Sequence, residues 1–135
     1  MTARGFVESV SVVKEGLLAA AYGATAMHDV TEGGVLGAAW EMAYAAECGV
    51  VIDAEKIPVH PVTKKLCAAL SLDPLRLISS GCMLIATANG EALVEKLAEA
   101  GVEAAVIGYA RGGGATLIDG TPIAPPEADE LYKLF

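Results

Sequence analysis

The sequence predicts an α+β domain in which a mixed β-sheet packs with helices. Apolar residues recur at helical spacing in several segments, and short β-branched or apolar runs of strand length lie between them. The end of the chain has the pattern of a hairpin, which favours a mixed sheet over a purely parallel one. The length of 135 residues fits one domain spanning residues 1–135.

The first half of the chain alternates helices with strands. Val10, Val13, Leu17 and Leu18 recur at helical spacing, and Gly23 is a plausible stop signal. The predicted elements of this half are a helix over 7–22, a strand over 25–28, a helix over 30–47 and a strand over 49–53.

The second half begins with Pro61, which suits the first turn of a helix. Asn89 is a candidate N-cap and Gly101 a candidate C′ residue for the helix between them. Asp119-Gly120 is a hairpin turn signal. The other predicted elements are a helix over 61–70, a short helix over 75–78, and strands over 82–88, 104–109 and 115–118.

The C-terminal tail, about residues 122–135, contains three prolines followed by four charged residues. We expect it to be flexible and poorly ordered, except for Leu131 to Leu134, whose pattern is that of a closing amphipathic turn.

Composition excludes several classes of protein. The chain is 54% hydrophobic, with a net charge of −8, and an acidic surface repels the phosphate backbone of nucleic acids. No apolar run approaches the roughly 18 residues of a membrane span. Residues 1–12 do not resemble a secretory signal, so a cytoplasmic location is expected. Three cysteines without CxxC spacing argue against a disulfide framework or a zinc site, and no metal site is predicted within the chain.

One motif carries chemistry, His28-Asp-Val-Thr-Glu-Gly-Gly34. Asp29 is a good N-cap, and Glu32 three residues later completes a capping box. Gly33 and Gly34 then fall inside the predicted first helical turn, where each glycine costs roughly 1 kcal/mol relative to alanine. Either another backbone packs against this turn, or an anionic ligand approaches its free N–H groups.

The candidate ligand-binding residues are therefore Asp29, Thr31, Glu32, Gly33 and Gly34. His28 is a weak candidate for a general base. It is adjacent to Asp29 in a strand, so the two side chains point to opposite faces and are not expected to pair.

These residues resemble the aminoimidazole-ribonucleotide (AIR) synthetase-related superfamily. Four blocks in order carry the resemblance, and they are similar above all to the HypE-like hydrogenase maturation factors. The blocks are Met27 to Val35, Asp53 to Val59, Leu72 to Gly81 with the apolar strand that follows, and Val106 to Gly108 before a glycine-rich hairpin.

The resemblance implies the C-terminal half of an ATP-dependent enzyme that activates an amide or carbamoyl-type group by phosphoryl transfer. It also implies an N-terminal nucleotide-binding domain, absent from this chain, as partner, homodimerisation, and ATP and Mg²⁺ as cofactors of the whole protein only. The isolated domain is predicted to be inactive and to self-associate weakly. Glu32 stands where these factors usually carry a basic residue, and the chain ends Leu131-Tyr-Lys-Leu-Phe135 in place of their terminal cysteine. Either that cysteine is trimmed or, as we favour, the substrate differs. The alternative is a non-catalytic interaction domain that retains only the fold.

Overall fold

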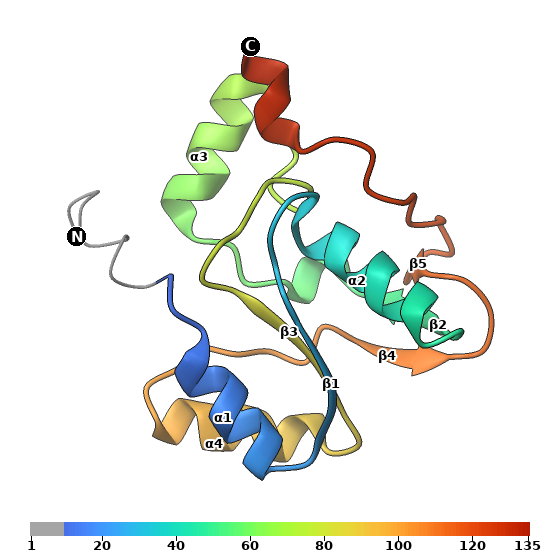
Figure 1. The fold of residues 1–135 in the computed structure, drawn as a ribbon. Coiled ribbons are helices and arrows are strands. Elements are labelled where there is room, and N and C mark those ends of the chain that lie inside the picture. Colours follow the sequence, from blue (N-terminus) through green and yellow to red (C-terminus); the bar gives the residue numbers. More distant parts are fainter. Residues whose placement is uncertain (1–9) are drawn as a thin grey trace.

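Residues 10–135 are described by a computed structural model, and they form four α-helices and five strands with two short 3₁₀ helices. The strands build two separate sheets, and helices pack on both (Figure 1). The predicted α+β class with mixed strand directions is confirmed.

The first sheet consists of β1 (Ala24–Asp29) and β3 (Met83–Thr87), which pair antiparallel. Helices α1 (Val13–Ala21) and α4 (Gly90–Glu99) lie side by side against it (Figure 1). Their contact is centred on Ala19, Leu93 and Leu97, all almost fully buried. Alanine at the centre lets the two helices approach closely, in keeping with the small side chains that dominate the composition.

The second sheet has β2 (Gly49–Ile52) at its centre. It pairs antiparallel with β4 (Gly108–Arg111) and parallel with β5 (Thr116–Leu117). Helix α2 (Gly34–Ala45) packs against β2 and also contacts both strands of the first sheet. This helix therefore joins the two sheets. Its buried residues Leu36 and Ala39 form the main core together with Ile52 of β2 and Ile123.

The remaining elements lie outside these layers. Helix α3 (Pro61–Leu70) begins after His60, whose Nδ1 accepts a hydrogen bond from the Val62 N–H at 3.2 Å, and buries only Cys67. The 3₁₀ helix η2 (Ala54–Lys56) follows β2, and η3 (Glu130–Leu134) lies beside α3 at the end of the chain (Figure 1).

Several predicted boundaries are wrong. The helix predicted from residue 30 begins at Gly34, and the strand predicted from residue 104 begins at Gly108. Residues 75–78 form a turn and a bend in place of a short helix. Asp73 Oδ1 accepts from the Leu75 N–H, and the Arg76 N–H bonds to the Asp73 carbonyl. The predicted helix over 7–22 is observed from Val13 to Ala21, and residues 7–9 lie outside the described part.

The C-terminal segment, residues 122–135, contacts the domain through two buried residues: Ile123 is 5% exposed within the main core, and Asp129 is equally buried.

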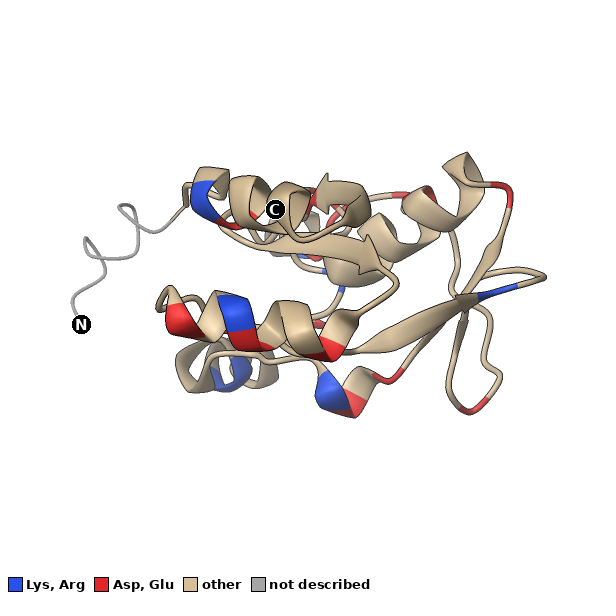
Figure 2. Ribbon diagram, turned by 90° about the horizontal axis from the view of Figure 1, so that it is seen from below, with Lys and Arg blue, Asp and Glu red and all other residues tan. Residues whose placement is uncertain are grey.

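No helix within residues 10–135 combines the length and the apolar character that crossing a membrane requires. Acidic residues are spread over several elements (Figure 2).

Candidate functional site

The motif turn, residues 28–34, connects β1 to α2. Asp29 is still paired with Met83 in the first sheet, and its side chain is 67% exposed. The N-cap of α2 is Gly33, in the left-handed conformation with φ of 82°. The predicted N-cap role of Asp29, and with it the capping box to Glu32, is therefore wrong, because the strand continues through Asp29 and the helix starts four residues later than expected.

Both glycines of the motif turn are required by the backbone and by packing. Gly34 also has a positive φ, of 64°, which disfavours any residue with a side chain. A Cβ on Gly33 would lie 2.7 Å from the Pro126 side chain, and one on Gly34 would lie 2.5 Å from the Leu75 carbonyl oxygen. Of the two explanations left open by the sequence, packing of the protein's own chain accounts for both glycines.

The N–H groups of these glycines already have acceptors. The Gly33 N–H donates to Asp129 Oδ2 at 2.9 Å, and the Gly34 N–H donates to the Thr31 carbonyl at 3.1 Å. The sequence predicted that Asp29 supplies the carboxylate at the start of this helix. The structure supplies it from Asp129, which lies 96 positions after Gly33 in the chain. An anion at these two amides would have to displace contacts that the domain makes with itself.

The C-terminal segment contributes more than Asp129 to the motif turn. The Tyr132 hydroxyl donates to Glu32 Oε1 at 3.3 Å, and Asp129 Oδ1 accepts from the Leu131 N–H at 2.9 Å. Sequence reasoning missed both Asp129 and Tyr132. Asp129 before Leu131 has the pattern of an N-cap, which was a usable signal for η3. No local pattern reveals a contact across most of the chain.

The same segment is bonded to the turn that follows α3. Glu130 Oε2 accepts from the Asp73 N–H at 3.0 Å, and the Arg76 guanidinium donates to the Ala124 carbonyl at 3.0 Å. Residues 73–76 in turn lie across Gly34, and the Leu36 N–H donates to the Leu75 carbonyl at 3.1 Å. The backbone of the motif turn is therefore held on two sides.

Three polar side chains of the motif turn stay open to solvent: Asp29, Thr31 and Glu32 are all exposed. Their two carboxylates and one hydroxyl are hard oxygen donors. This is the part of the predicted site that the structure leaves available to a ligand.

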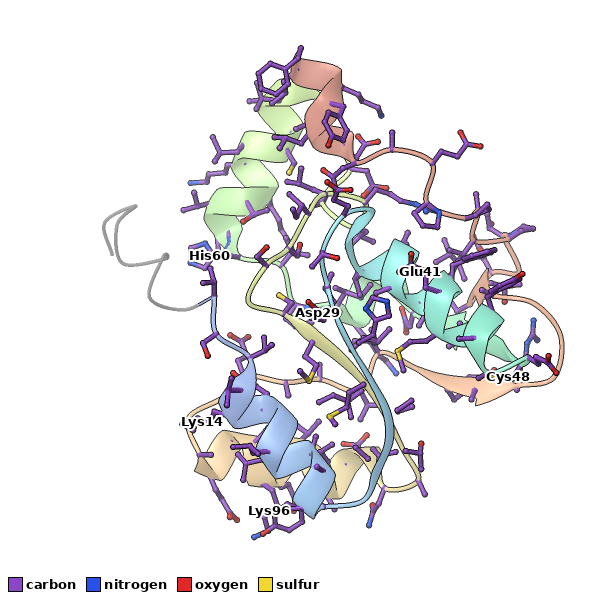
Figure 3. The ribbon with its side chains drawn as sticks, viewed as in Figure 1. Lys14, Asp29, Glu41, Cys48, His60 and Lys96 are labelled. Atoms are coloured by element: carbon purple, nitrogen blue, oxygen red, sulfur yellow. The ribbon has the colours of Figure 1, made fainter. Side chains whose placement is uncertain are left out.

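His28 is engaged within the domain. Its Nε2 lies 2.9 Å from Glu41 Oε2 on α2, and its Nδ1 lies 2.6 Å from the Asp29 carbonyl oxygen. The Asp29 carboxylate is further away, at 4.0 Å from Nδ1, as expected for neighbours on a strand. Through these two contacts His28 links β1 to α2. Figure 3 labels the residues that it contacts, Asp29 at the end of β1 and Glu41 on α2.

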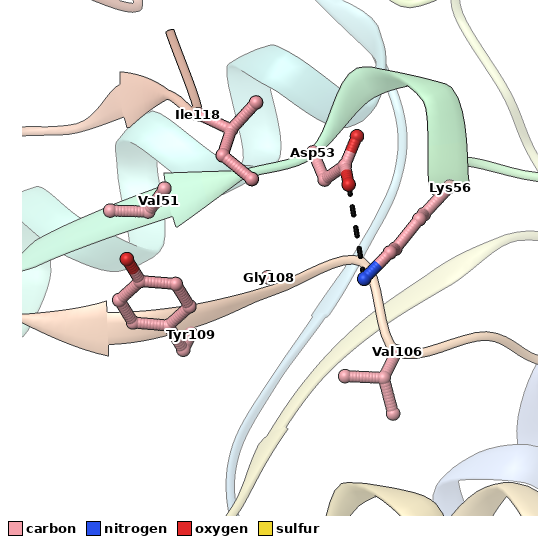
Figure 4. Close-up of a pocket in the computed structure, with 7 residues that line it drawn as sticks. All are labelled: Val51, Asp53, Lys56, Val106, Gly108, Tyr109 and Ile118. Atoms are coloured by element: carbon pink, nitrogen blue, oxygen red, sulfur yellow. Dashed lines mark ion pairs between the residues drawn. The ribbon is translucent and has the colours of Figure 1, made fainter. Parts of the chain in front are cut away.

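Two cavities lie away from the motif turn. One, of about 120 Å³, is lined by Val51, Tyr109 and Ile118 and by the Asp53–Lys56 ion pair at 3.8 Å (Figure 4). The other, of about 320 Å³, lies beside the stacked rings of Trp40 and Tyr44 and the glycine loop at residues 113–114. Within residues 10–135, no three side chains of His, Cys, Asp or Glu are grouped so that they could hold a metal ion.

Several solved structures with a similar fold are hydrogenase maturation proteins. Escherichia coli HypE superposes with a TM-score of 0.77 at 28% identity, covering 92% of this chain and 42% of that one. A HypE–HypF complex gives a TM-score of 0.72 at 25% identity, covering 85% and 41%. A HypE structure in complex with ATP has 24% identity and a TM-score of 0.65 over 77% and 36% of the two chains, and it supports the fold alone.

Curated proteins with similar sequences are also hydrogenase maturation proteins. Carbamoyl dehydratase HypE of Rhodobacter capsulatus is 40% identical over 76 residues, which make up 56% of this chain and 22% of the relative. A putative hydrogenase expression/formation protein of Methanocaldococcus jannaschii is 37% identical over 89 residues, 63% of this chain and 27% of the relative. The chain thus spans about a quarter of the length of these relatives.

The sequence profile of one family, "AIR synthase related protein, C-terminal domain", matches residues 4–119. Because this match covers most of the chain and the HypE fold covers nearly all of it, the chain belongs to the AIR synthase-related C-terminal domain family and is HypE-like within it.

Proposed function

We propose that the chain is the C-terminal half of an ATP-dependent, HypE-like enzyme that acts on an amide or carbamoyl-type group through phosphoryl activation, with this half on the acceptor side. The observation that carries the proposal is the motif turn: a backbone fixed by Gly33, Gly34 and Asp129 presents the exposed polar groups of Asp29, Thr31 and Glu32. Catalysis of phosphoryl transfer depends mainly on positioning and charge, so rigid presentation of a few polar groups is what such a half must supply.

The partner in this proposal is an N-terminal nucleotide-binding domain of the same protein, in a homodimer located in the cytoplasm. Several relatives carry this family's domain as part of a longer chain, and one solved relative is a complex with ATP. ATP and Mg²⁺ would bind between the two halves.

The motif turn fits a share in holding Mg²⁺. Carboxylate oxygens are the ligands this ion prefers, and Asp29 and Glu32 provide them at the surface. When bound, the ion neutralises charge on the transferred phosphoryl group. The residues of this chain would hold and orient it: Tyr132 restrains Glu32 through its hydroxyl, and pairing of β1 with β3 fixes the backbone of Asp29.

The second candidate is a non-catalytic interaction domain that keeps only the fold. It is favoured by His28, Gly33 and Gly34, whose polar groups are all engaged in contacts within the domain. On this view the motif survives as packing alone.

The two functions separate in a chimera in which this chain replaces the C-terminal domain of E. coli HypE. The enzyme proposal expects the chimera to hydrolyse ATP, with a loss of at least about tenfold for Asp29→Asn, the scale of removing one charged group from a phosphoryl-transfer site. Asp119→Asn is the matched control, because Asp119 is an exposed turn residue whose side chain bonds locally, to Thr121. A folded chimera whose ATP hydrolysis is unchanged by Asp29→Asn would support the interaction domain.

A further inference from the structure

Helix α3 is nearly uncovered by the rest of the described chain. Only Cys67 of its ten residues is buried. Val62, Leu66 and Leu70, spaced four residues apart on one side of the helix, are 51%, 57% and 47% exposed. An isolated helix of this length is marginal in water, so packing must provide its stability, and the described chain provides little.

Exposed apolar side chains also occur on η3, which lies beside α3 (Figure 1). The turn that follows α3 is tied to η3 by the hydrogen bond from the Asp73 N–H to Glu130. Leu134 and Phe135 of this end are 42% and 96% exposed. We call this surface the α3–η3 face; its members are Val62, Leu66, Leu70, Leu131, Leu134 and Phe135. An uncovered apolar surface built from two elements marks an interface.

The position of the α3–η3 face indicates what covers it. Tyr132, in η3, bonds to Glu32 of the motif turn, so the face and the open polar groups of that turn border each other. A domain that reaches the motif turn therefore also reaches η3. The chain corresponds to 42% of the E. coli HypE chain, so in such a protein more than half of the mass is available to cover this face.

Charge argues against a second copy as the occupant. Helix α3 contains Lys64 and Lys65 and no acidic residue, although the whole chain has a net charge of −8. The acidic residue of η3, Glu130, is paired with Lys133. A two-fold interface places the same patch of both copies together, and would bring these lysines toward each other. An occupant with carboxylates around an apolar centre is complementary.

We propose that the α3–η3 face is the docking surface for the nucleotide-binding half of the protein, which meets it with an apolar centre and an acidic rim. This inference rests on the proposed function only in naming which half docks. The proposal explains why the apolar residues of α3 are exposed. It also places residues 131–135 in the interface between the two halves.

The test compares Leu66→Ser with Leu17→Ser, in the 135-residue chain and in the E. coli HypE chimera. Leu17 is a matched control because it is an apolar residue on α1, 69% exposed. In the isolated chain, both variants are expected to keep the urea midpoint of the parent, since neither side chain is buried. In the chimera, amide hydrogen exchange of α3 is expected to slow by roughly tenfold or more relative to the isolated chain, and Leu66→Ser, but not Leu17→Ser, to reverse this protection.

Three results would overturn the proposal. One is equal α3 exchange in the chimera and the isolated chain while α2 is protected in both. Another is a lowered urea midpoint of isolated Leu66→Ser, which would mean that the face is internal packing. The third is a tight dimer of the isolated chain that Leu66→Ser dissociates, which would make a second copy the occupant. The last two need only the isolated chain. If α3 is protected in the chimera but ATP hydrolysis by the chimera is unchanged by Asp29→Asn, the proposed enzyme function is refuted and the docking proposal still holds.

Discussion

At the scale of single residues, the motif turn depends on Gly34. Its φ is 64°, and a Cβ there would lie 2.5 Å from the Leu75 carbonyl oxygen and 2.8 Å from the Arg76 carbonyl carbon. Backbone atoms cannot move aside as a flexible side chain can, so Gly34→Ala is expected to lower the free energy of unfolding by about 3 kcal/mol.

Gly101→Ala is the control, because Gly101 has a φ of 76° and open space where a Cβ would stand. It carries only the conformational penalty, about 1–2 kcal/mol. Urea unfolding of the two variants measures the difference, and equal losses would show that backbone approach at Gly34 does not matter.

Asp129 is the other residue on which the turn depends. It is 5% exposed and accepts from two N–H groups, of Gly33 and Leu131. Asp129→Ala leaves the Gly33 N–H without its acceptor and is expected to cost about 1–3 kcal/mol. Asp119→Ala, at an exposed turn, should cost less. Faster hydrogen exchange of the Gly33 amide in Asp129→Ala alone would connect the loss to the motif turn, and unchanged exchange would contradict this account.

At the scale of elements, η3 is held to the turn after α3 by a carboxylate, so its attachment depends on pH. Hydrogen bonds from Lys133 and from the Asp73 N–H hold the pKa of Glu130 below its usual range. A carboxyl group whose pKa is lowered on folding stabilises the fold fully above its unfolded pKa, about 4.3, and loses that contribution as the pH falls through the folded value.

We therefore expect η3 to loosen below about pH 4, in the window between these two values. Glu130→Gln should remove most of this dependence. The Asp73 amide shift, followed by NMR from pH 7 to pH 3, reports the contact directly. An identical titration in Glu130→Gln would assign the transition to another group.

Elements were predictable from the sequence where a local pattern determines them. The order of helices and strands follows from hydrophobic spacing, and Pro61 marks the start of α3 correctly. Helix α2 was misplaced because its N-cap residue is a left-handed glycine whose acceptor comes from Asp129, and no local rule can supply a distant carboxylate. The apolar spacing of Val62, Leu66 and Leu70 indicates one side of a helix, but periodicity does not say whether a partner covers it.

At the scale of the whole molecule, the family and fold were predictable because several motif blocks occur in the right order. The site was predictable only in part. The exposure of Asp29 and Glu32 leaves them available as proposed, whereas His28 is engaged by Glu41 and the two glycines by the chain's own backbone and side chains. Tertiary contacts determine which residues of the motif are exposed and which are engaged, and a local sequence pattern does not specify tertiary contacts.

The isolated chain is expected not to hydrolyse ATP. The exposed donors of the motif turn are two carboxylates and a hydroxyl, which lack the cationic and backbone N–H groups that cradle phosphates. A coupled phosphate-release assay on ATPase-free protein measures this, with the HypE chimera as the positive control. Turnover by the isolated chain that disappears with Asp29→Ala would show that a single domain suffices.

The burial of Ile123 has a consequence for biosynthesis. Ile123 belongs to the main core with Leu36 and Ile52, and Asp129 fastens the start of α2 from 96 positions downstream. Contacts between segments so far apart form only after most of the chain is available. During vectorial synthesis α2 therefore emerges from the ribosome without the residues that complete its surroundings, and these contacts form only after residues 123 and 129 have emerged. Nascent chains arrested before residue 123 would remain open to proteases and chaperones, however well their helices had formed.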